Sequence, residues 1–214
     1  MEIEAKFTIP DEETFQRLLA APALGGFNLA SPALLHVRDR YLDTPTGAIR
    51  AGGYACRLRR EDDRFLAGVK GLGGVSGALH RRAEHEQPIP RPLPPADWPP
   101  GPVRDLVLRL SGGQTLICLF EVEQARHTRS LLDAGRTLAQ LSFDRISIGR
   151  EGVVAARFLE LEAELQVAGQ VRDLERLASQ IEAEWALSPQ SHSKFERGLA
   201  LFGLSATPQG EAAR

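Results

Sequence analysis

The first seven residues carry side chains that could bind both a metal ion and a phosphate. Glu2, Glu4 and Lys6 alternate with apolar residues. Because successive side chains of a β-strand point to opposite faces, the two carboxylates and the ammonium share one face. Carboxylates are ligands for hard divalent cations, and basic groups bind phosphate oxygens. The same pattern is also typical of an ordinary strand with a solvent-exposed charged face.

The pattern recurs on one face of several later strands, whose opposite faces are largely apolar. These charged positions are Arg57 and Arg59; Lys70; Arg82, Glu84 and Glu86; Arg126; Asp144; and Glu160, Glu162 and Glu164. An open sheet would leave them in water, whereas a closed antiparallel barrel would point them into a wet tunnel. Inward charges need partners. They can pair with one another, or hold a polyphosphate together with its metal ions.

The elements that must position these residues follow from hydrophobic periodicity and turn signals. Besides the first strand, strands are expected at 34–44, 54–60, 64–70, 79–87, 115–123, 125–132, 137–144 and 153–167, with a turn at 146–150. Helices are expected at 11–21, 103–110, 171–186 and 194–202. The segments 22–33, 71–77 and 88–102 are predicted loops. No domain boundary is visible, so we predict one domain over 1–204 and a flexible tail over 205–214.

Composition limits the class of protein. The chain has 214 residues, a formal net charge of -2 and two cysteines. Nothing in the overall charge indicates nucleic acid or an anionic membrane as a partner. The first residues are not an apolar leader, and no run approaches the ~20 apolar residues that span a bilayer. We therefore expect a cytoplasmic protein, a monomer or homodimer, whose partner is a small molecule.

Other conspicuous residues have simpler explanations. Glu86 is expected to pair with Arg82, to face water or to join the site. The five histidines show no metal-ligand spacing, and Cys56 and Cys118 are expected in the core. Asp43 lies at the end of a predicted strand, where turn capping and catalysis are both open. Arg60, Arg81 and Arg129 lie on the other face of their strands and are predicted to be surface residues.

The motifs resemble those of the CYTH superfamily, the triphosphate tunnel metalloenzymes. The ExExK run of Glu2, Glu4 and Lys6 is followed, in the family's order, by Tyr41-Leu42-Asp43-Thr44-Pro45, Arg57-Leu58-Arg59, Lys70-Gly71, Arg82-x-Glu84, Glu160-Leu161-Glu162-x-Glu164 and Ser193-Lys194-x-x-Arg197-Gly198. The resemblance extends to about Gly203. The stretch from Val75 to Arg82 makes the chain most similar to the CYTH part of bacterial inorganic triphosphatases.

This resemblance implies an α+β fold: a closed eight-stranded antiparallel barrel that forms a tunnel, with helices packed outside and a C-terminal plug helix. Triphosphate would be bound by Lys6, Arg57, Arg59, Lys70, Arg82, Arg126, Lys194 and Arg197. One or two Mg²⁺ or Mn²⁺ ions would be bound by Glu2, Glu4, Asp144, Glu160, Glu162 and Glu164, with Glu84 as a further ligand. The residues expected to take part in catalysis are Lys6, Arg59, Lys70 and Glu162.

The activity implied is metal-dependent hydrolysis of triphosphates, with inorganic triphosphate giving pyrophosphate and phosphate. One ion would bridge phosphate oxygens and another would activate water, while the basic residues stabilise the leaving pyrophosphate. A class IV adenylate cyclase and a thiamine triphosphatase are alternatives. Each needs an organic pocket, and the sequence shows no clear aromatic cluster. A non-catalytic polyphosphate- or nucleotide-binding module is the third hypothesis. The many carboxylates argue against it.

Overall fold

The computed structural model describes residues 1–204, and the predicted tail at 205–214 lies outside the described residues. The longer strands are β1 (Glu2–Ile9), β4 (Ala33–Asp43), β5 (Tyr54–Glu61), β6 (Arg64–Gly71), β8 (Leu79–Arg82), β9 (Glu84–Ile89), β10 (Ile117–Asp133), β11 (Arg136–Arg150) and β12 (Val153–Leu165). The short strands are β2 (Ala23–Leu24), β3 (Phe27–Leu29), β7 (Val75–Ser76) and β13 (Ser188–Pro189). The helices are α1 (Glu12–Ala20), α2 (Ala48–Ala51), α3 (Pro102–Ser111), α4 (Val171–Trp185) and α5 (Lys194–Leu201), with a 3₁₀ turn η1 (Pro95–Asp97).

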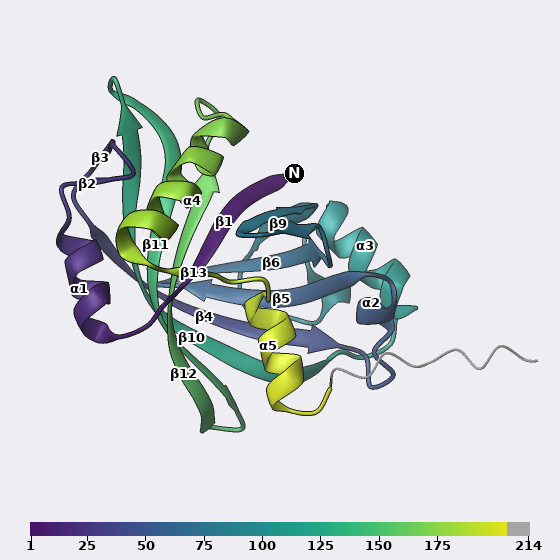
Figure 1. Cartoon of the computed structure of the whole chain (residues 1–214). Helices are drawn as coiled ribbons and strands as arrows, with labels where there is room; N and C mark the ends of the chain where they lie inside the picture. The colour runs from purple at the N-terminus through teal and green to yellow at the C-terminus, as the bar shows by residue number, and fades with distance from the viewer. Residues whose placement is uncertain (205–214) are drawn as a thin grey trace, which may run out of the picture.

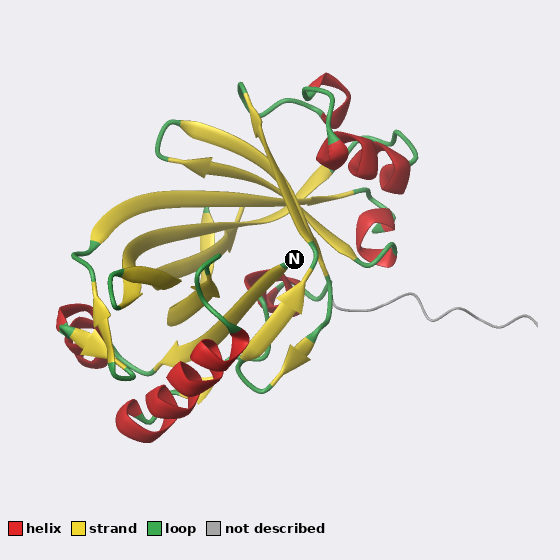
Figure 2. Cartoon of the chain, turned by 90° about the horizontal axis from the view of Figure 1, so that it is seen from above, coloured by secondary structure: helices red, strands yellow, loops and turns green. Residues whose placement is uncertain are grey.

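The strands form one antiparallel sheet in an α+β fold (Figure 1). Its hydrogen-bonded path runs β7-β8-β1-β12-β11-β10-β4-β5-β6-β9. The sheet is strongly curled around a central space when seen from above (Figure 2). This path has two separate ends, so the structure establishes a curled sheet and does not by itself confirm the closed eight-stranded barrel.

Strand alternation divides the sheet into an apolar outer face and a charged inner face. On β12, Leu161 and Ala163 lie in an apolar cluster with residues of α1 and α4, whereas Glu160 and Glu162 lie on the other face. A second cluster joins the outer face of β5 and β6 to α3 through residues such as Val107. Burying such side chains stabilises each helix against the sheet by roughly 1.5–3 kcal/mol per large residue.

Two predictions about strands 10 and 11 were wrong. The predicted strands 115–123 and 125–132 are one continuous strand, β10. The polar Gln124 does not break the strand, because its side chain points to the inner face and is only 3 % exposed. The predicted turn at 146–150 belongs to β11, and the turn lies at Glu151 and Gly152, both with positive φ. The predicted loop at 22–33 also contains the short strands β2 and β3.

Two charged residues outside the central space have structural roles. Asp43 accepts hydrogen bonds from the backbone N–H groups of Thr44, Ile49 and Arg50, which holds the short helix α2 in place. Arg129 was predicted to be a surface residue and is instead buried. It donates hydrogen bonds to backbone carbonyls at the end of α1 and around β3, which cover that part of the outer face.

The helices take the positions that their amphipathic patterns indicate. The predicted helices 11–21 and 171–186 correspond to α1 and α4, which pack on the apolar outer face. By contrast, α5 packs its Phe195 and Leu199 against Tyr41 and Phe120 in a third apolar cluster. None of the helices in the described part of the chain is long and apolar enough to cross a membrane.

Candidate active site

Strand register brings residues that are far apart in the sequence together on the inner face. Lys6 lies opposite Glu162, and Arg126 lies opposite Asp144. At the start of the chain, Glu2 lies opposite Arg82. Directly opposed side chains of antiparallel strands have Cβ atoms about 4.5–5.5 Å apart, so opposite charges meet across each pair of strands.

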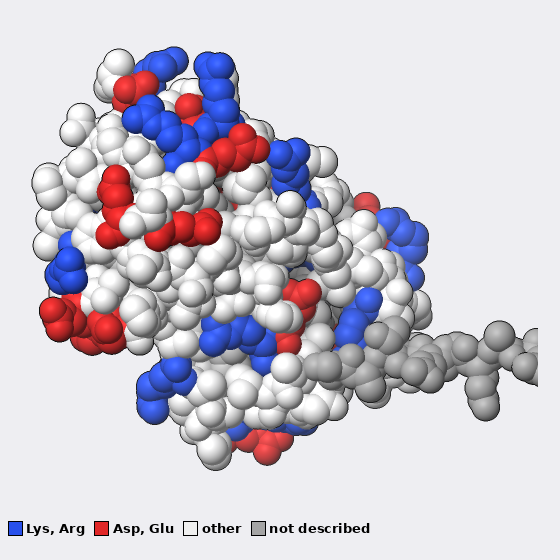
Figure 3. Space-filling model, viewed as in Figure 1, with Lys and Arg blue, Asp and Glu red and all other residues white. Residues whose placement is uncertain are grey.

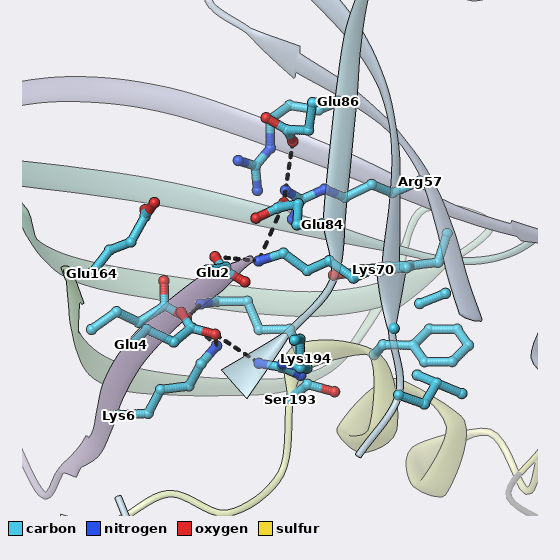
Figure 4. A pocket seen from close by; sticks show the side chains of 18 of the residues that line it. Glu2, Glu4, Lys6, Arg57, Lys70, Glu84, Glu86, Glu164, Ser193 and Lys194 are labelled. Carbon is cyan, nitrogen blue, oxygen red and sulfur yellow. Dashed lines mark hydrogen bonds and ion pairs between the residues drawn. The ribbon is translucent and has the colours of Figure 1, made fainter. Parts of the chain in front are cut away.

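A cavity of about 140 Å³ lies on this inner face (Figure 4). Its lining includes twelve of the fifteen predicted site residues, namely Glu2, Glu4, Lys6, Arg57, Arg59, Lys70, Arg82, Glu84, Arg126, Glu162, Glu164 and Lys194. Asp144, Glu160 and Arg197 do not line it. In the space-filling view, a hollow with acidic and basic atoms beside it lies near the middle of the face toward the viewer (Figure 3).

The most deeply buried part of the cavity holds a chain of alternating charges. The Nζ of Lys6 lies 2.6 Å from Oε1 of Glu162 and 3.2 Å from Oε1 of Glu4. Arg82 donates from Nη2 to the same oxygen of Glu4 at 2.7 Å. Burial alone would raise the pKa of Glu4, but Lys6, Lys70 and Arg82 together lower it to about 2. All these groups are therefore charged near neutral pH.

Lys194, the first residue of α5, places its ammonium among three buried carboxylates. Its Nζ lies 2.5 Å from Glu160 Oε1, 2.8 Å from Glu162 Oε1 and 3.3 Å from Asp144 Oδ2. Oxygens of these three carboxylates lie within 4.8 Å of one another, a spacing that could also hold a metal ion. In this structure the lysine ammonium lies at that group of carboxylates.

Side-chain exposure increases from this buried part of the cavity toward an acidic rim, which is formed by Glu2, Glu84, Glu86 and Glu164. Lys70 donates to Glu2 at 2.8 Å and lies 3.4 Å from Glu84. Glu86 pairs with Arg57 at 2.7 Å rather than with Arg82, and the side chain of Glu86 is 32 % exposed. Glu164 is exposed, and it forms no ion pair within residues 1–204. The entrance to the cavity is therefore lined by carboxylates.

The rim carboxylates carry more negative charge than the nearby cation balances. Burial and the charge of Glu4 raise the pKa of Glu2 to about 7 against the opposing effect of Lys70. Partial desolvation of its carboxyl group and the charge of Glu2 also raise the pKa of Glu164, although part of that residue is exposed. The Oε2 atom of Glu2 is buried without a hydrogen-bond partner in the described structure. An additional cation beside Glu2 would relieve both problems, so Glu2 fits a ligand of a divalent metal, with Glu4 and Glu164 opposite one another on the paired strands β1 and β12.

Asp39 is a site residue that sequence reasoning missed. It projects inward from β4 and is fully buried between Arg57 and Arg59, which line the cavity. The signal was present in the alternation of Val37, Asp39 and Tyr41 on β4. The more numerous charges of the outer face, such as Arg38, obscured it.

An apolar wall on one side of the cavity was also missed. Tyr41, Ala55, Leu72 and Phe195 line it, and the rings of Tyr41 and Phe195 are 5.3 Å apart. These residues come from two strands, the residue after a third strand and a helix, so no local cluster marks them in the sequence. The sequence shows no clear aromatic cluster, whereas the structure brings the rings of Tyr41 and Phe195 together beside the cavity.

Arg197 has a different environment from the other predicted phosphate ligands. Its guanidinium lies 3.3 Å from the ring centroid of Phe158 and 4.0 Å from Oε2 of Glu160. It is outside the lining of the cavity, so direct contact between Arg197 and a substrate stays a prediction.

Comparison with known protein families gives one decisive match. The CYTH domain model matches residues 1–198. The chain belongs to the CYTH domain family. The matched range includes every residue of the predicted site, from Glu2 to Arg197. The family resemblance read from the sequence motifs is thus confirmed.

Solved structures similar to this CYTH domain support the fold over nearly its full length. A putative adenylyl cyclase from Hippeastrum, described as having a dominant triphosphatase activity, is 20% identical with a TM-score of 0.62, covering 97% of this chain and 98% of that chain. A putative adenylate cyclase from Bacillus halodurans is 21% identical with a TM-score of 0.61, covering 92% and 96% of the two chains. The PH1819 protein from Pyrococcus horikoshii is 18% identical with a TM-score of 0.57, covering 94% and 99%.

Proposed function

We propose that this CYTH domain is a metal-dependent triphosphatase that converts inorganic triphosphate to pyrophosphate and phosphate. The observation that carries the proposal is a cavity lined by seven basic side chains, each held by carboxylates, with further carboxylates at its rim. Basic groups bind phosphate oxygens. A site that only bound an anion would not need so many acidic residues.

The charge balance supports a metal requirement. The seven bases are Lys6, Arg57, Arg59, Lys70, Arg82, Arg126 and Lys194. The carboxylates that line the cavity or pair with these bases are Glu2, Glu4, Asp39, Glu84, Glu86, Asp144, Glu160, Glu162 and Glu164. Nine acids against seven bases leave no excess positive charge for a polyanion. Triphosphate is therefore expected to enter together with divalent cations.

Glu2, Glu4 and Glu164 would supply ligands for Mg²⁺ or Mn²⁺ at the rim, and Glu84 shares the Lys70 ammonium with Glu2. Among the described residues, the three carboxylates whose oxygens all lie within 4.8 Å of one another are Asp144, Glu160 and Glu162. The other predicted metal ligands, Asp144, Glu160 and Glu162, already surround the Lys194 ammonium. An ion there would have to displace that ammonium. When bound, the metal would supply Lewis-acid polarisation of the phosphoryl group.

The residues of the chain would then bind and orient the phosphates. Buried positive charge for the phosphates comes from Lys6, Arg57, Arg59, Arg82 and Lys194. Lys70, whose side chain is 20 % exposed, offers a charge nearer the entrance. Arg126 and Glu162 hold one another at 2.8 Å, and Glu162 also fixes the ammonium groups of Lys6 and Lys194. Such prearranged cations stabilise the charge that develops on the leaving pyrophosphate.

The same proposal includes a closed eight-stranded tunnel within one domain, residues 1–204. β8 pairs with β1, β9 pairs with β6, and only Ala83 separates β8 from β9. The continuous segment 79–89 would thus join the two sides of the curled sheet and make the eighth strand. The alternation of charge on the inner face supports this arrangement.

A triphosphate with an organic group is the second candidate substrate. The apolar wall of Tyr41, Ala55, Leu72 and Phe195 favours it, because an aromatic or heterocyclic group could pack there. ATP and thiamine triphosphate are the two compounds to compare. Formation of cyclic AMP from ATP would favour a cyclase.

The test is phosphate release by untagged protein, since site residues begin at Glu2. Inorganic triphosphate, ATP and thiamine triphosphate would each be supplied with Mg²⁺, Mn²⁺ or EDTA. Triphosphate hydrolysis that EDTA abolishes, that Glu162→Ala loses and that the exposed-residue control Arg81→Ala retains is the expected result. Binding without turnover of any substrate would contradict the proposal and favour a non-catalytic binding module.

A further inference from the structure

Asp39 is the buried group around which two phosphate-binding arginines are arranged. Arg59 donates from Nε to Oδ1 at 2.8 Å and from Nη2 to Oδ2 at 2.9 Å, a side-on bidentate pair. Arg57 places Nη1 3.7 Å from Oδ2, and Gln124 donates to Oδ2 at 3.2 Å. Asp39 is fully buried and does not line the cavity, so it can act on a ligand only through these neighbours.

The bidentate pair fixes which edge of Arg59 remains for a ligand. A guanidinium is planar, so two hydrogen bonds to one carboxylate lock both its plane and its rotation. Nε and Nη2 of Arg59 are committed to Asp39, which leaves Nη1 without a protein partner in the described structure. Arg59 lines the cavity, and Nη1 is its remaining group for a phosphate oxygen.

Asp39 also offsets the repulsion that the Arg59 guanidinium experiences from Arg57 and Arg126. Burial and the charge of Arg57 both disfavour the Arg59 guanidinium, and Arg126 adds to the repulsion. The carboxylate of Asp39 outweighs these effects, so the pKa of Arg59 lies above its ordinary value. Gln124 extends the arrangement, because it accepts a hydrogen bond from Nη2 of Arg126 at 3.3 Å while donating to Asp39.

We propose that Asp39 is a positioning residue of the phosphate site: it aligns Arg59 and Arg57 toward the cavity, and Gln124 relays that alignment to Arg126. This inference deepens the proposed function and rests on it for the identity of the ligand. It predicts that replacing Asp39 changes the free energy of ligand binding more than the free energy of unfolding.

The test compares Asp39→Asn with Asp43→Asn, an equally buried aspartate of β4 that caps α2 and lies outside the cavity. Binding would be measured by calorimetry with the imido analogue of triphosphate, whose P–N–P links resist hydrolysis, in the presence of Mn²⁺. We expect Asp39→Asn to weaken binding about 10- to 100-fold, which corresponds to the loss of about one charge-assisted hydrogen bond. Asp43→Asn should lower the unfolding temperature and leave the dissociation constant unchanged.

A double-mutant cycle with Arg59→Ala separates positioning from a general loss of structure. If Asp39 acts largely through Arg59, the loss of binding in the double variant is clearly smaller than the sum of the two single losses. Fully additive losses, or normal binding by Asp39→Asn, would overturn the inference. These outcomes do not depend on turnover: a wild-type protein that binds the analogue but hydrolyses no triphosphate refutes the proposed enzyme and leaves the role of Asp39 measurable.

Discussion

The Nζ of Lys194 lies 2.5 Å from Oε1 of Glu160, and both side chains are buried. This contact joins the first residue of α5 to the inner face of β12. A lysine at a helix N-terminus gains nothing from the helix dipole, so the carboxylates of Glu160, Glu162 and Asp144 must account for its position. They raise the pKa of Lys194 against the opposing effect of burial. The ammonium is therefore a fixed positive charge of the cavity.

Replacing this charge should affect both folding and catalysis. In Lys194→Met the stem is kept, but the three carboxylates lose their shared cation. We expect a loss of about 3–5 kcal/mol in the free energy of unfolding, measured by urea denaturation in EDTA, and at least a tenfold fall in kcat/KM. Mn²⁺ should restore more stability to this variant than to the wild type, because the vacated carboxylates can bind it.

Arg172→Met, on the exposed side of α4, is the control for loss of a basic residue from a helix. It should change neither stability nor activity. Wild-type stability and kinetics in Lys194→Met would refute the view that this ammonium belongs to the site.

The regular alternation of β1 and β12 is what made the site predictable. In both strands each polar residue is followed by an apolar one, so Glu2, Lys6 and Glu162 could be assigned to one face from sequence alone. Their spatial meeting needed the register, which depends on partner strands more than 150 residues away. The family motifs supplied that long-range information.

The residues that the sequence analysis missed share one physical reason for being missed. Asp39 lies between the less polar Val37 and Tyr41 on its face of β4, and Gln124 lies in the gap predicted between two strands. A short pattern does not show which face of a strand turns inward. Arg129 has outward parity, yet α1 and β3 cover it and supply carbonyl acceptors. Burial of this kind depends on which loops fold over the sheet, and that information is not local.

Gly198 should be essential for seating α5. A Cβ atom at this position would lie 2.2 Å from Cε2 of Phe120, well inside van der Waals contact. Gly198→Ala must therefore shift the helix or the ring, at a cost of about 1–3 kcal/mol. Because Lys194 begins the same helix, we also expect KM for triphosphate to rise severalfold. Thermal unfolding and steady-state kinetics would measure the two effects.

Ala200→Gln is the matched control, because Ala200 lies on the exposed face of α5. It should leave both measurements near the wild-type values. If Gly198→Ala behaves in the same way, α5 is not packed as tightly against Phe120 as the structure indicates.

Arg129 should stabilise the fold without contributing to activity. It donates to the carbonyls of Leu19, Ala21, Leu29 and Ala30, and these acceptors would be left unsatisfied in Arg129→Met. We expect a loss of about 3 kcal/mol or more in the free energy of unfolding. The activity per folded molecule should be unchanged because Arg129 does not line the cavity.

The exposed Arg81 supplies the comparison for this substitution. Arg81→Met should alter stability by no more than about 0.5 kcal/mol, as expected for a surface change. Equal stability losses in the two variants would mean that Arg129 is not buried against these carbonyls.

The rim carboxylate Glu164 should favour metal binding at the expense of stability. Burial and the charge of Glu2 raise its pKa, so the folded protein disfavours its ionised form when no metal is bound. Glu164→Gln is therefore expected to unfold at a higher temperature than the wild type in EDTA. It should bind Mn²⁺ at least tenfold more weakly, measured by calorimetry. Glu175→Gln on the exposed face of α4 should change neither value, and unchanged Mn²⁺ affinity in Glu164→Gln would exclude Glu164 as a ligand.

The carboxylate of Asp39 should make stability depend on pH in the acidic range. Arg59 and Arg57 outweigh the effect of burial and hold the pKa of Asp39 well below its ordinary value of 3.8. A depressed pKa gives stability that is present above the unfolded-state pKa and is lost as the pH falls through the folded-state pKa. The stability difference between wild type and Asp39→Asn should thus be constant from pH 7 to about 5 and shrink below about pH 4, measured by urea denaturation at each pH. Asp63→Asn, at a fully exposed aspartate, should show a difference near zero throughout, and a gap for Asp39→Asn that widens in acid would contradict the buried ion pair.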